Sequence, residues 1–170
     1  MQQIFLTGEC AGEVAARALS SLRVRTAGYR LLPLEVAGCL RGRVLHLLTV
    51  PDEPYFNDVP CDVQLAPGQR KIIREVFGKI AAPALRQAVS AHVPLFIDGV
   101  CREMLQSKAF CEAVTACVKG RCQVFAVVDA DAAEAVRAMS DRSEQLWIRA
   151  DVGHENEALR QLLQELSMRL

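Results

Sequence analysis

The stretch QIFLTGECAGEVAARAL, residues 3–19, decides the fold class of this chain. Residues 3–7 form an apolar run that predicts a buried strand, and residues 13–22 have the apolar spacing of a helix. The turn between them, residues 8–12, carries a glycine at each end. A strand, a glycine-bearing turn and a helix in this order are typical of phosphate-binding loops, whose backbone N–H groups hold the anion. The lysine and the hydroxyl residue that complete such a loop are missing, so the stretch predicts either an altered phosphate site or a tight turn.

Three later apolar runs predict further buried strands, at residues 93–100, 122–128 and 144–150. None of them alternates strictly between apolar and polar residues, which is typical of a parallel sheet covered on both faces. Pro83 is expected to kink or split the first of four helices. These helices are predicted from the spacing of apolar residues in the segments 69–91, 108–118, 131–139 and 155–168.

Residues 28–68, which follow the first predicted helix, differ from the rest of the chain in their pattern of apolar residues, glycines and prolines. Residues 28–50 contain two strand-like runs with Gly38 and Gly42 near their turn, which predicts a β-hairpin. Residues 51–68 contain four prolines and predict an irregular, proline-rich loop.

The order of these elements predicts an α/β domain. We expect one three-layer domain over residues 1–170, with a mostly parallel sheet and a β-hairpin insertion. A ligand site in such a domain lies beyond the carboxyl ends of the strands. The turn at residues 8–12 and the aspartate that follows the strand-like run PLFI, Asp98, both fall at such ends.

Composition narrows the classes of function. Twenty basic and twenty acidic residues cancel, which argues against a nucleic acid or an anionic membrane as partner. The sequence has no apolar run of the roughly 18 residues that a membrane span needs. It also lacks the pattern of a signal peptide, so we expect a cytoplasmic protein. The seven cysteines include no C-x-x-C pair and are expected to be free thiols.

Several segments resemble the small P-loop nucleoside-triphosphatase family, of the thermophilic and cancer-related nucleoside-triphosphatase type. The family reads roughly IFLTGEPGVGKTT where residues 4–16 read IFLTGECAGEVAA. It reads PALRRA where residues 83–88 read PALRQA, and IDEIGKMEL-S--F--AV where residues 97–114 read IDGVCREMLQSKAFCEAV. The resemblance is collinear over most of the chain and weakest across residues 39–68. It implies a P-loop NTPase-like fold with Walker A and Walker B motifs.

The departures from the family pattern are concentrated at the positions that carry its chemistry. Val14 stands for the P-loop lysine, Ala15 for the Mg²⁺-binding threonine, Glu13 for the last loop glycine and Gly99 for the glutamate after the Walker B aspartate. Asp98 is kept as the implied metal ligand. By position, the resemblance implies that the loop consists of Gly8, Glu9, Cys10, Ala11, Gly12, Glu13, Val14 and Ala15.

The resulting prediction is a degenerate NTPase-like protein with little or no hydrolysis, acting by binding an unknown protein or small ligand. No catalytic residue is assigned, and whether the chain is an enzyme stays open. One alternative is residual nucleotide binding with slow phosphohydrolase activity, in which Gly8 to Ala15 hold phosphate and Asp98 holds Mg²⁺; Mg²⁺ and a nucleoside triphosphate are cofactors in that case alone. A second alternative is a thiol-based metal or redox site formed by Cys10 and Cys101.

One group of basic residues has side chains that could reach and bind a phosphate. We expect these side chains to form a solvated surface instead; they are Arg41, Arg43, Arg70, Lys71 and Arg74.

Overall fold

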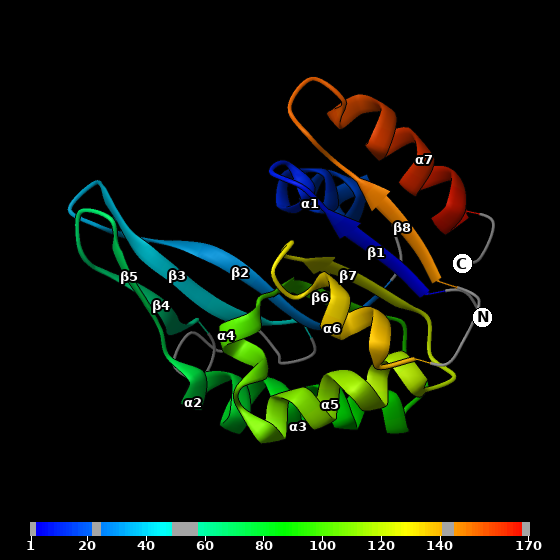
Figure 1. Cartoon of the computed structure of the whole chain (residues 1–170), viewed down its shortest axis with the longest axis horizontal. Helices are drawn as coiled ribbons and strands as arrows, with labels where there is room; N and C mark the ends of the chain where they lie inside the picture. Colours follow the sequence, from blue (N-terminus) through cyan, green and yellow to red (C-terminus); the bar gives the residue numbers. More distant parts are fainter. Residues whose placement is uncertain (1–2, 22–24, 49–57, 141–144, 168–170) are drawn as a thin grey trace.

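An eight-stranded sheet forms the middle layer of the molecule, with the strand order β5-β4-β3-β2-β6-β7-β1-β8 (Figure 1). The computed structural model describes residues 3–21, 25–48, 58–140 and 145–167. Strands β2, β6, β7, β1 and β8 run parallel to their neighbours in this order, and β2, β3, β4 and β5 pair antiparallel. The strands are β1 (Gln3–Thr7), β2 (Ala27–Val36), β3 (Cys39–Leu47), β4 (Val59–Ala66), β5 (Gln69–Ile72), β6 (Leu95–Val100), β7 (Val124–Val128) and β8 (Gln145–Arg149).

Helices cover both faces of this sheet, as the sequence predicts for a three-layer α/β fold. Helices α1 (Ala11–Ser21) and α7 (Glu155–Ser167) lie on one face, and the remaining helices lie on the other (Figure 1). Among the described residues, no helix has the length and apolar character that crossing a bilayer requires. The second face carries α2 (Arg74–Val76), a π-helical turn η1 (Phe77–Ala81), α3 (Ala82–Ser90), α4 (Arg102–Leu105), α5 (Lys108–Lys119) and α6 (Ala133–Ala138).

Alternation of side chains along the strands creates two apolar cores. In β1, Ile4 and Leu6 pack with α1 and α7, whereas Phe5 packs on the opposite face. The core on that second face is the larger one, and it contains the aromatic rings of Phe77 and Phe110 with centroids 5.4 Å apart. The continuous apolar runs of the sequence are therefore explained by burial on both sides of the sheet.

The predicted β-hairpin is confirmed as β2 and β3, and its turn consists of Ala37 and Gly38. Both residues have positive φ, 52° and 73°, which matches the two-residue turns that follow the twist of a hairpin. Strands β4 and β5 extend this hairpin into a four-stranded projection (Figure 1). We call residues 33–43 and 62–71, which form its outer part, the arm.

Two predictions for the neighbouring segment are wrong. Residues 59–66, predicted as part of an irregular loop, form β4, and residues 69–72, predicted as helix, form β5. Gly68, with φ of 75°, reverses the chain after Pro67, and β5 then pairs with β4. Pairing of β4 with β3 and of β5 with β4 decided this segment, which proline content and apolar spacing cannot reveal. The predicted loop residues 51–57 lie outside the described residues.

The helical part of 69–91 begins at Arg74 and changes character along its length. The π-helical turn η1 separates α2 from α3, and Pro83 lies in the first turn of α3. The predicted split is not seen: the helical backbone continues from Arg74 to Ser90, with Ala81 and Ala82 both in α-helical conformation. What changes is the helix type, because the π-helical turn lies directly before the turn that contains Pro83.

Candidate functional site

The turn after β1 is shorter than the sequence predicts. Helix α1 begins at Ala11, so three residues, 8–10, join it to β1. The reason is an apolar face that continues into the expected loop: Ala11, Val14, Ala15 and Ala18 are all buried, at the spacing of one helix face. Gly12 and Glu13, which the resemblance places in a phosphate loop, therefore lie in the first turn of the helix.

The short turn is held against the end of β8. The N–H of Cys10 donates to the carbonyl of Ala150 at 2.9 Å, and the N–H of Ala11 donates to the carbonyl of Gly8 at 3.2 Å. Gly8 has φ of 111°, and a Cβ there would lie 2.5 Å from the Ala150 oxygen, so this close approach requires glycine. Two backbone donors of the expected loop are thus used within the chain.

The side chains at the expected lysine and threonine positions lie inside the protein. Val14 and Ala15 are both 0% exposed and belong to the core between α1, α7 and the sheet. Glu9 and Glu13 are exposed around the start of the helix. Carboxylates at a helix N-terminus are favourable because they complement its positive end. Exposed carboxylates therefore lie around the start of α1.

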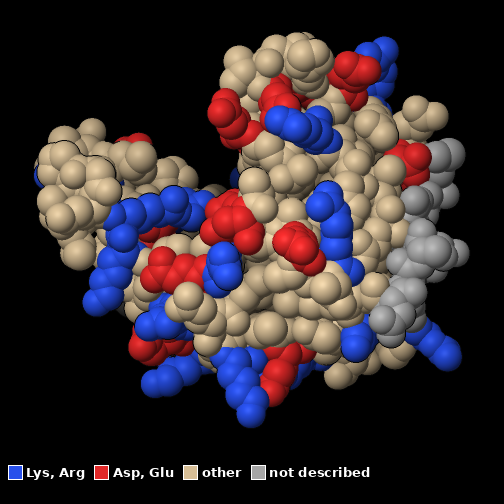
Figure 2. All heavy atoms as spheres, in the orientation of Figure 1, with Lys and Arg blue, Asp and Glu red and all other residues tan. Residues whose placement is uncertain are grey.

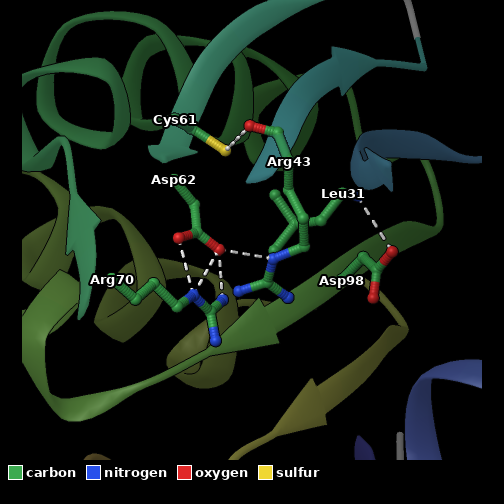
Figure 3. Close-up of polar contacts among 6 residues, drawn as sticks. All are labelled: Leu31, Arg43, Cys61, Asp62, Arg70 and Asp98. Atoms are coloured by element: carbon green, nitrogen blue, oxygen red, sulfur yellow. Dashed lines mark hydrogen bonds and ion pairs between the residues drawn. The ribbon is translucent and has the colours of Figure 1, made fainter. Parts of the chain in front are cut away.

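Asp98, the expected metal ligand, is close to the end of β6. Its Oδ2 accepts a hydrogen bond from the N–H of Leu31 at 2.9 Å, as Figure 3 shows. Burial raises the pKa of Asp98, and the backbone hydrogen bond and the charges of Arg30 and Arg43 oppose this shift. The carboxylate thus joins β6 to β2 where the two strands separate.

Gly99 occupies the position of the family's second acidic residue in a conformation that favours glycine. Its φ is 82°, and a Cβ there would lie 2.8 Å from Cδ1 of Leu31. Its carbonyl accepts a hydrogen bond from the buried hydroxyl of Tyr29 at 2.9 Å. The backbone is therefore fixed in a form that a glutamate side chain does not fit without strain.

The turn at residues 8–10 and Asp98 lie at the same edge of the sheet, because the turn follows β1, Asp98 lies near the carboxyl end of β6, and these strands run parallel. Strand β7 lies between β1 and β6. Two strand spacings separate the backbones of β1 and β6, or about 10 Å. The two segments thus lie at one edge of the sheet, as the sequence predicts, but their polar groups form hydrogen bonds within the protein: those of the turn with Ala150 and Gly8, and that of Asp98 with Leu31.

The two cysteines of the thiol alternative lie on opposite faces of the sheet. Cys10 packs against the α1 and α7 core, and Cys101 belongs to the core of the other face. The Cys10 thiol donates to the Glu155 carboxylate at 3.5 Å. Burial is the main cause that raises the pKa of the Cys10 thiol, and the hydrogen bond with Glu155 and its charge raise that pKa further. Burial also raises the pKa of Cys101. Among the described residues, no three His, Cys, Asp or Glu side chains form a group suited to a metal ion.

A second polar site lies on the arm, and the sequence analysis missed it. Arg43 on β3 and Arg70 on β5 both bind Asp62 on β4, whose side chain is 2% exposed (Figure 3). Nε of Arg43 lies 2.8 Å from Oδ2, and Nε of Arg70 lies 2.6 Å from both carboxylate oxygens. The two arginines are thus fixed by a buried partner and are not simply a solvated surface. Asp62 is missed from the sequence because its pairing opposite Arg43 depends on the register of β3 and β4.

Comparisons with known proteins identify the fold. Models of known protein families do not match this chain, and neither do curated protein sequences. The crystal structure of THEP1 from the hyperthermophile Aquifex aeolicus superposes with a TM-score of 0.72 and 17% identity, over 96% of this chain and 98% of that chain. The solution structure of a human cancer-related nucleoside triphosphatase superposes with a TM-score of 0.70 and 18% identity, over the full length of both chains. This chain therefore has the fold of the P-loop nucleoside triphosphatases.

Proposed function

We propose that this protein acts by binding a partner protein or a small ligand, with little or no hydrolysis of nucleoside triphosphates. The observation that carries the proposal is the burial of Val14 and Ala15 within a continuous helix. A working P-loop needs a lysine and a hydroxyl group facing the phosphates, and an open loop whose N–H groups surround them. Here that loop is replaced by a helical turn.

The electrostatics support the same conclusion. A nucleoside triphosphate bound at the end of β1 meets the exposed carboxylates of Glu9 and Glu13 and no lysine from the loop. The start of a helix contributes only about 0.3–1 kcal/mol per charge at an exposed site. Removing one well-placed stabiliser of the transition state commonly lowers a rate by roughly 10²–10³-fold. Several such groups are replaced here, and Asp98 is the one that remains.

The test is to measure nucleotide binding and phosphate release by the unaltered protein. We expect millimolar Mg·ATP and Mg·GTP to release no phosphate above background and to leave the melting temperature unchanged. A ligand present at about 100 times its Kd stabilises a protein by about 2.7 kcal/mol, so real binding is readily detected. Phosphate release that Asp98→Asn abolishes would refute the proposal and favour a residual phosphohydrolase.

A matched variant shows whether the loss is local to the loop. It restores the family's loop sequence on the same scaffold, and binding of Mg·ATP by this variant but not by the unaltered chain is the expected result. The substitutions are Cys10→Pro, Ala11→Gly, Gly12→Val, Glu13→Gly, Val14→Lys and Ala15→Thr.

A further inference from the structure

The arm contains a groove at the site where two arginines meet. Its volume is about 480 Å³, within the range of sites for small molecules, and Arg43, Asp62 and Arg70 form its polar part. Figure 2 shows Lys and Arg side chains running from the arm toward the middle of the molecule, beside Asp and Glu side chains. The groove involves no residue of the β1–α1 turn, so it is separate from the altered phosphate loop.

Asp62 holds both guanidinium groups in place. It is buried on β4, and it accepts from Nε of Arg43 and from Nε and Nη2 of Arg70. A guanidinium held in this way loses little further freedom when it binds a ligand, which favours affinity. The arginines come from the strands on either side of β4, so pairing of the sheet itself sets their separation.

Each arginine keeps donors that no other described residue uses. Both terminal nitrogens of Arg43, and Nη1 of Arg70, donate no hydrogen bond to another described residue. The side chains of Arg43 and Arg70 are 33% and 53% exposed, and both line the groove.

The lining of the groove carries two guanidinium groups and one carboxylate, Asp62, which serves both of them. Arg43 also faces Asp98 and Asp129: burial raises the pKa of both carboxyls, and Arg43 opposes the shift at each. The charge of Arg43 is thus shared among several carboxylates, whereas Asp62 is the carboxylate that pairs with Arg70.

The rest of the groove is suited to an organic group attached to an anion. Leu40 is 60% exposed and supplies an apolar wall, and Gln64 and Gln69 add amide groups. Gly42 lets β3 approach β4 closely beside Arg43, because a Cβ there would lie 1.9 Å from the Asp62 carbonyl oxygen. The lining therefore combines fixed donors, amides and one apolar surface, as small-molecule sites do.

We propose that this groove binds a small organic anion through its carboxylate or phosphate group. The free donors of Arg70 and Arg43 bind the oxyanion, because guanidinium forks match the geometry of both groups. Leu40 contacts the organic part of the ligand. This site goes beyond the proposed function and does not depend on whether nucleotide hydrolysis is lost.

A purely structural role for the three side chains makes a different prediction. If Asp62 and the arginines only hold the arm together, replacing Arg70 lowers the melting temperature and no anion shifts it. If the groove is a site, an anion raises the melting temperature of the unaltered protein, and replacing Arg70 removes that rise.

The test measures binding to the full chain by calorimetric titration. Two probes, phenyl phosphate and benzoate, share a phenyl ring and differ in the oxyanion. Inorganic phosphate is the third probe, because it lacks the organic part. We expect saturable binding of one or both aromatic anions at millimolar concentration, and weaker binding of inorganic phosphate. Arg70→Gln is expected to weaken binding by roughly 10-fold or more, since a charge-assisted contact is about twice as strong as a neutral one.

Arg41→Gln is the matched control, because Arg41 is exposed on the same strand β3 but outside the groove lining. This variant makes the same change of charge and is expected to bind as the unaltered chain does. If Arg70→Gln does not fold, binding is located by NMR of the unaltered protein instead. The amide signals of Gly42 and Gly68, which line the groove, are expected to shift when phenyl phosphate or benzoate is added. Preference for phenyl phosphate or for benzoate then identifies the oxyanion.

Three results would overturn the proposal. They are no saturable binding of either aromatic anion, equal weakening by Arg41→Gln and Arg70→Gln, and inorganic phosphate binding as tightly as phenyl phosphate.

Discussion

At the scale of single residues, two buried glutamines differ in whether their amides have partners. The amide nitrogen of Gln3 donates to the carbonyls of Val118 and Cys122 at 3.4 and 3.2 Å, and its oxygen accepts from the N–H of Val124 at 2.8 Å. Gln123 is 5% exposed, and its Nε2 is buried without a hydrogen-bond partner among the residues that the structure describes. The first side chain joins β1 to the start of β7, whereas the second carries an uncompensated desolvation cost.

Substitution by methionine is therefore expected to have opposite effects at the two positions. Gln3→Met lowers the free energy of unfolding by roughly 1–3 kcal/mol, because it leaves buried backbone groups unpaired. Gln123→Met raises it by about 1 kcal/mol, because an unpaired amide is replaced by an apolar group of similar shape. Urea denaturation measures both values. Destabilisation by Gln123→Met comparable to that by Gln3→Met would contradict this explanation.

Gly99 provides a test of how firmly the end of β6 is fixed. Gly99→Ala is expected to destabilise the protein by roughly 1–3 kcal/mol, because of its positive φ and the contact of a Cβ with Leu31. Gly68→Ala is the control: Gly68 has a similar φ of 75°, but a Cβ there meets nothing within 4 Å. Thermal denaturation should show the larger loss at Gly99, and equal losses would mean that Leu31 adapts freely.

The carboxyl of Asp98 makes stability depend on pH. Burial raises its pKa above the ordinary 3.8, so the folded protein keeps this proton to higher pH than the unfolded chain does. Stability from this group is therefore lost as pH rises from about the unfolded value through the folded one. Asp98→Asn removes the titration, and the oxygen of asparagine can still accept from the Leu31 N–H.

Melting temperatures of Asp98→Asn and the unaltered protein, measured between acidic and neutral pH, test this account. We expect the variant to gain relative stability as pH rises above the unfolded pKa. A difference in melting temperature that stays constant with pH would exclude Asp98 as the source.

At the scale of elements, α1 is the feature on which the proposed loss of phosphate binding rests. Gly12 lies in its first turn, is exposed, and has nothing within 4 Å of a built Cβ. Gly12→Ala is therefore expected to stabilise the protein by about 0.5–1 kcal/mol, because alanine is the better helix former. Chemical denaturation measures the change, with Gly8→Ala as the destabilising control. A loss of stability in Gly12→Ala would mean that the segment needs the freedom of a loop.

Sequence reasoning predicted the elements whose patterns are local. The apolar runs at residues 3–7, 93–100, 122–128 and 144–150 correspond to β1, β6, β7 and β8. Strands β1, β6 and β7 are buried on both faces, whereas β8 lies at the edge of the sheet and is only partly buried. The β2–β3 hairpin was likewise predictable from its glycines. Strands β4 and β5 were not, because exposed strands on the arm lack a strong apolar pattern and depend on pairing.

The same difference applies to the candidate sites. The placement of the turn at residues 8–10 and of Asp98 at one edge of the sheet could be predicted, because the carboxyl ends of parallel strands lie at the same edge. The start of α1 at Ala11 was not predicted, because the glycines at positions 8 and 12 are typical of a loop. The apolar spacing of Ala11, Val14 and Ala15 is the signal that indicates the longer helix. The contact of Asp62 with two arginines was also hidden, because it joins three strands whose register is a tertiary property.

At the scale of the whole molecule, the sheet has a covered half and an exposed half. Strands β1, β6 and β7 are buried between two layers of helices, and β7 is buried at every position. The arm carries most of its residues in contact with solvent, and Leu40 and Leu65 are more than half exposed. Local opening requires less free energy where few apolar contacts are lost. Amide hydrogen exchange is therefore expected to be slowest in β1, β6 and β7 and fastest in β4 and β5.

Asp62→Asn tests whether the arm opens independently of the central strands. The substitution weakens both ion pairs that join β4 to β3 and β5. We expect faster exchange in β4 and β5 and unchanged exchange in β1 and β7, because these central strands pack in the cores and do not contact Asp62. Mass spectrometry of exchanged peptides resolves the two regions. If exchange accelerates equally in the central strands, the arm and the core open as one unit, and the Asp62 contacts then contribute to the stability of the whole sheet.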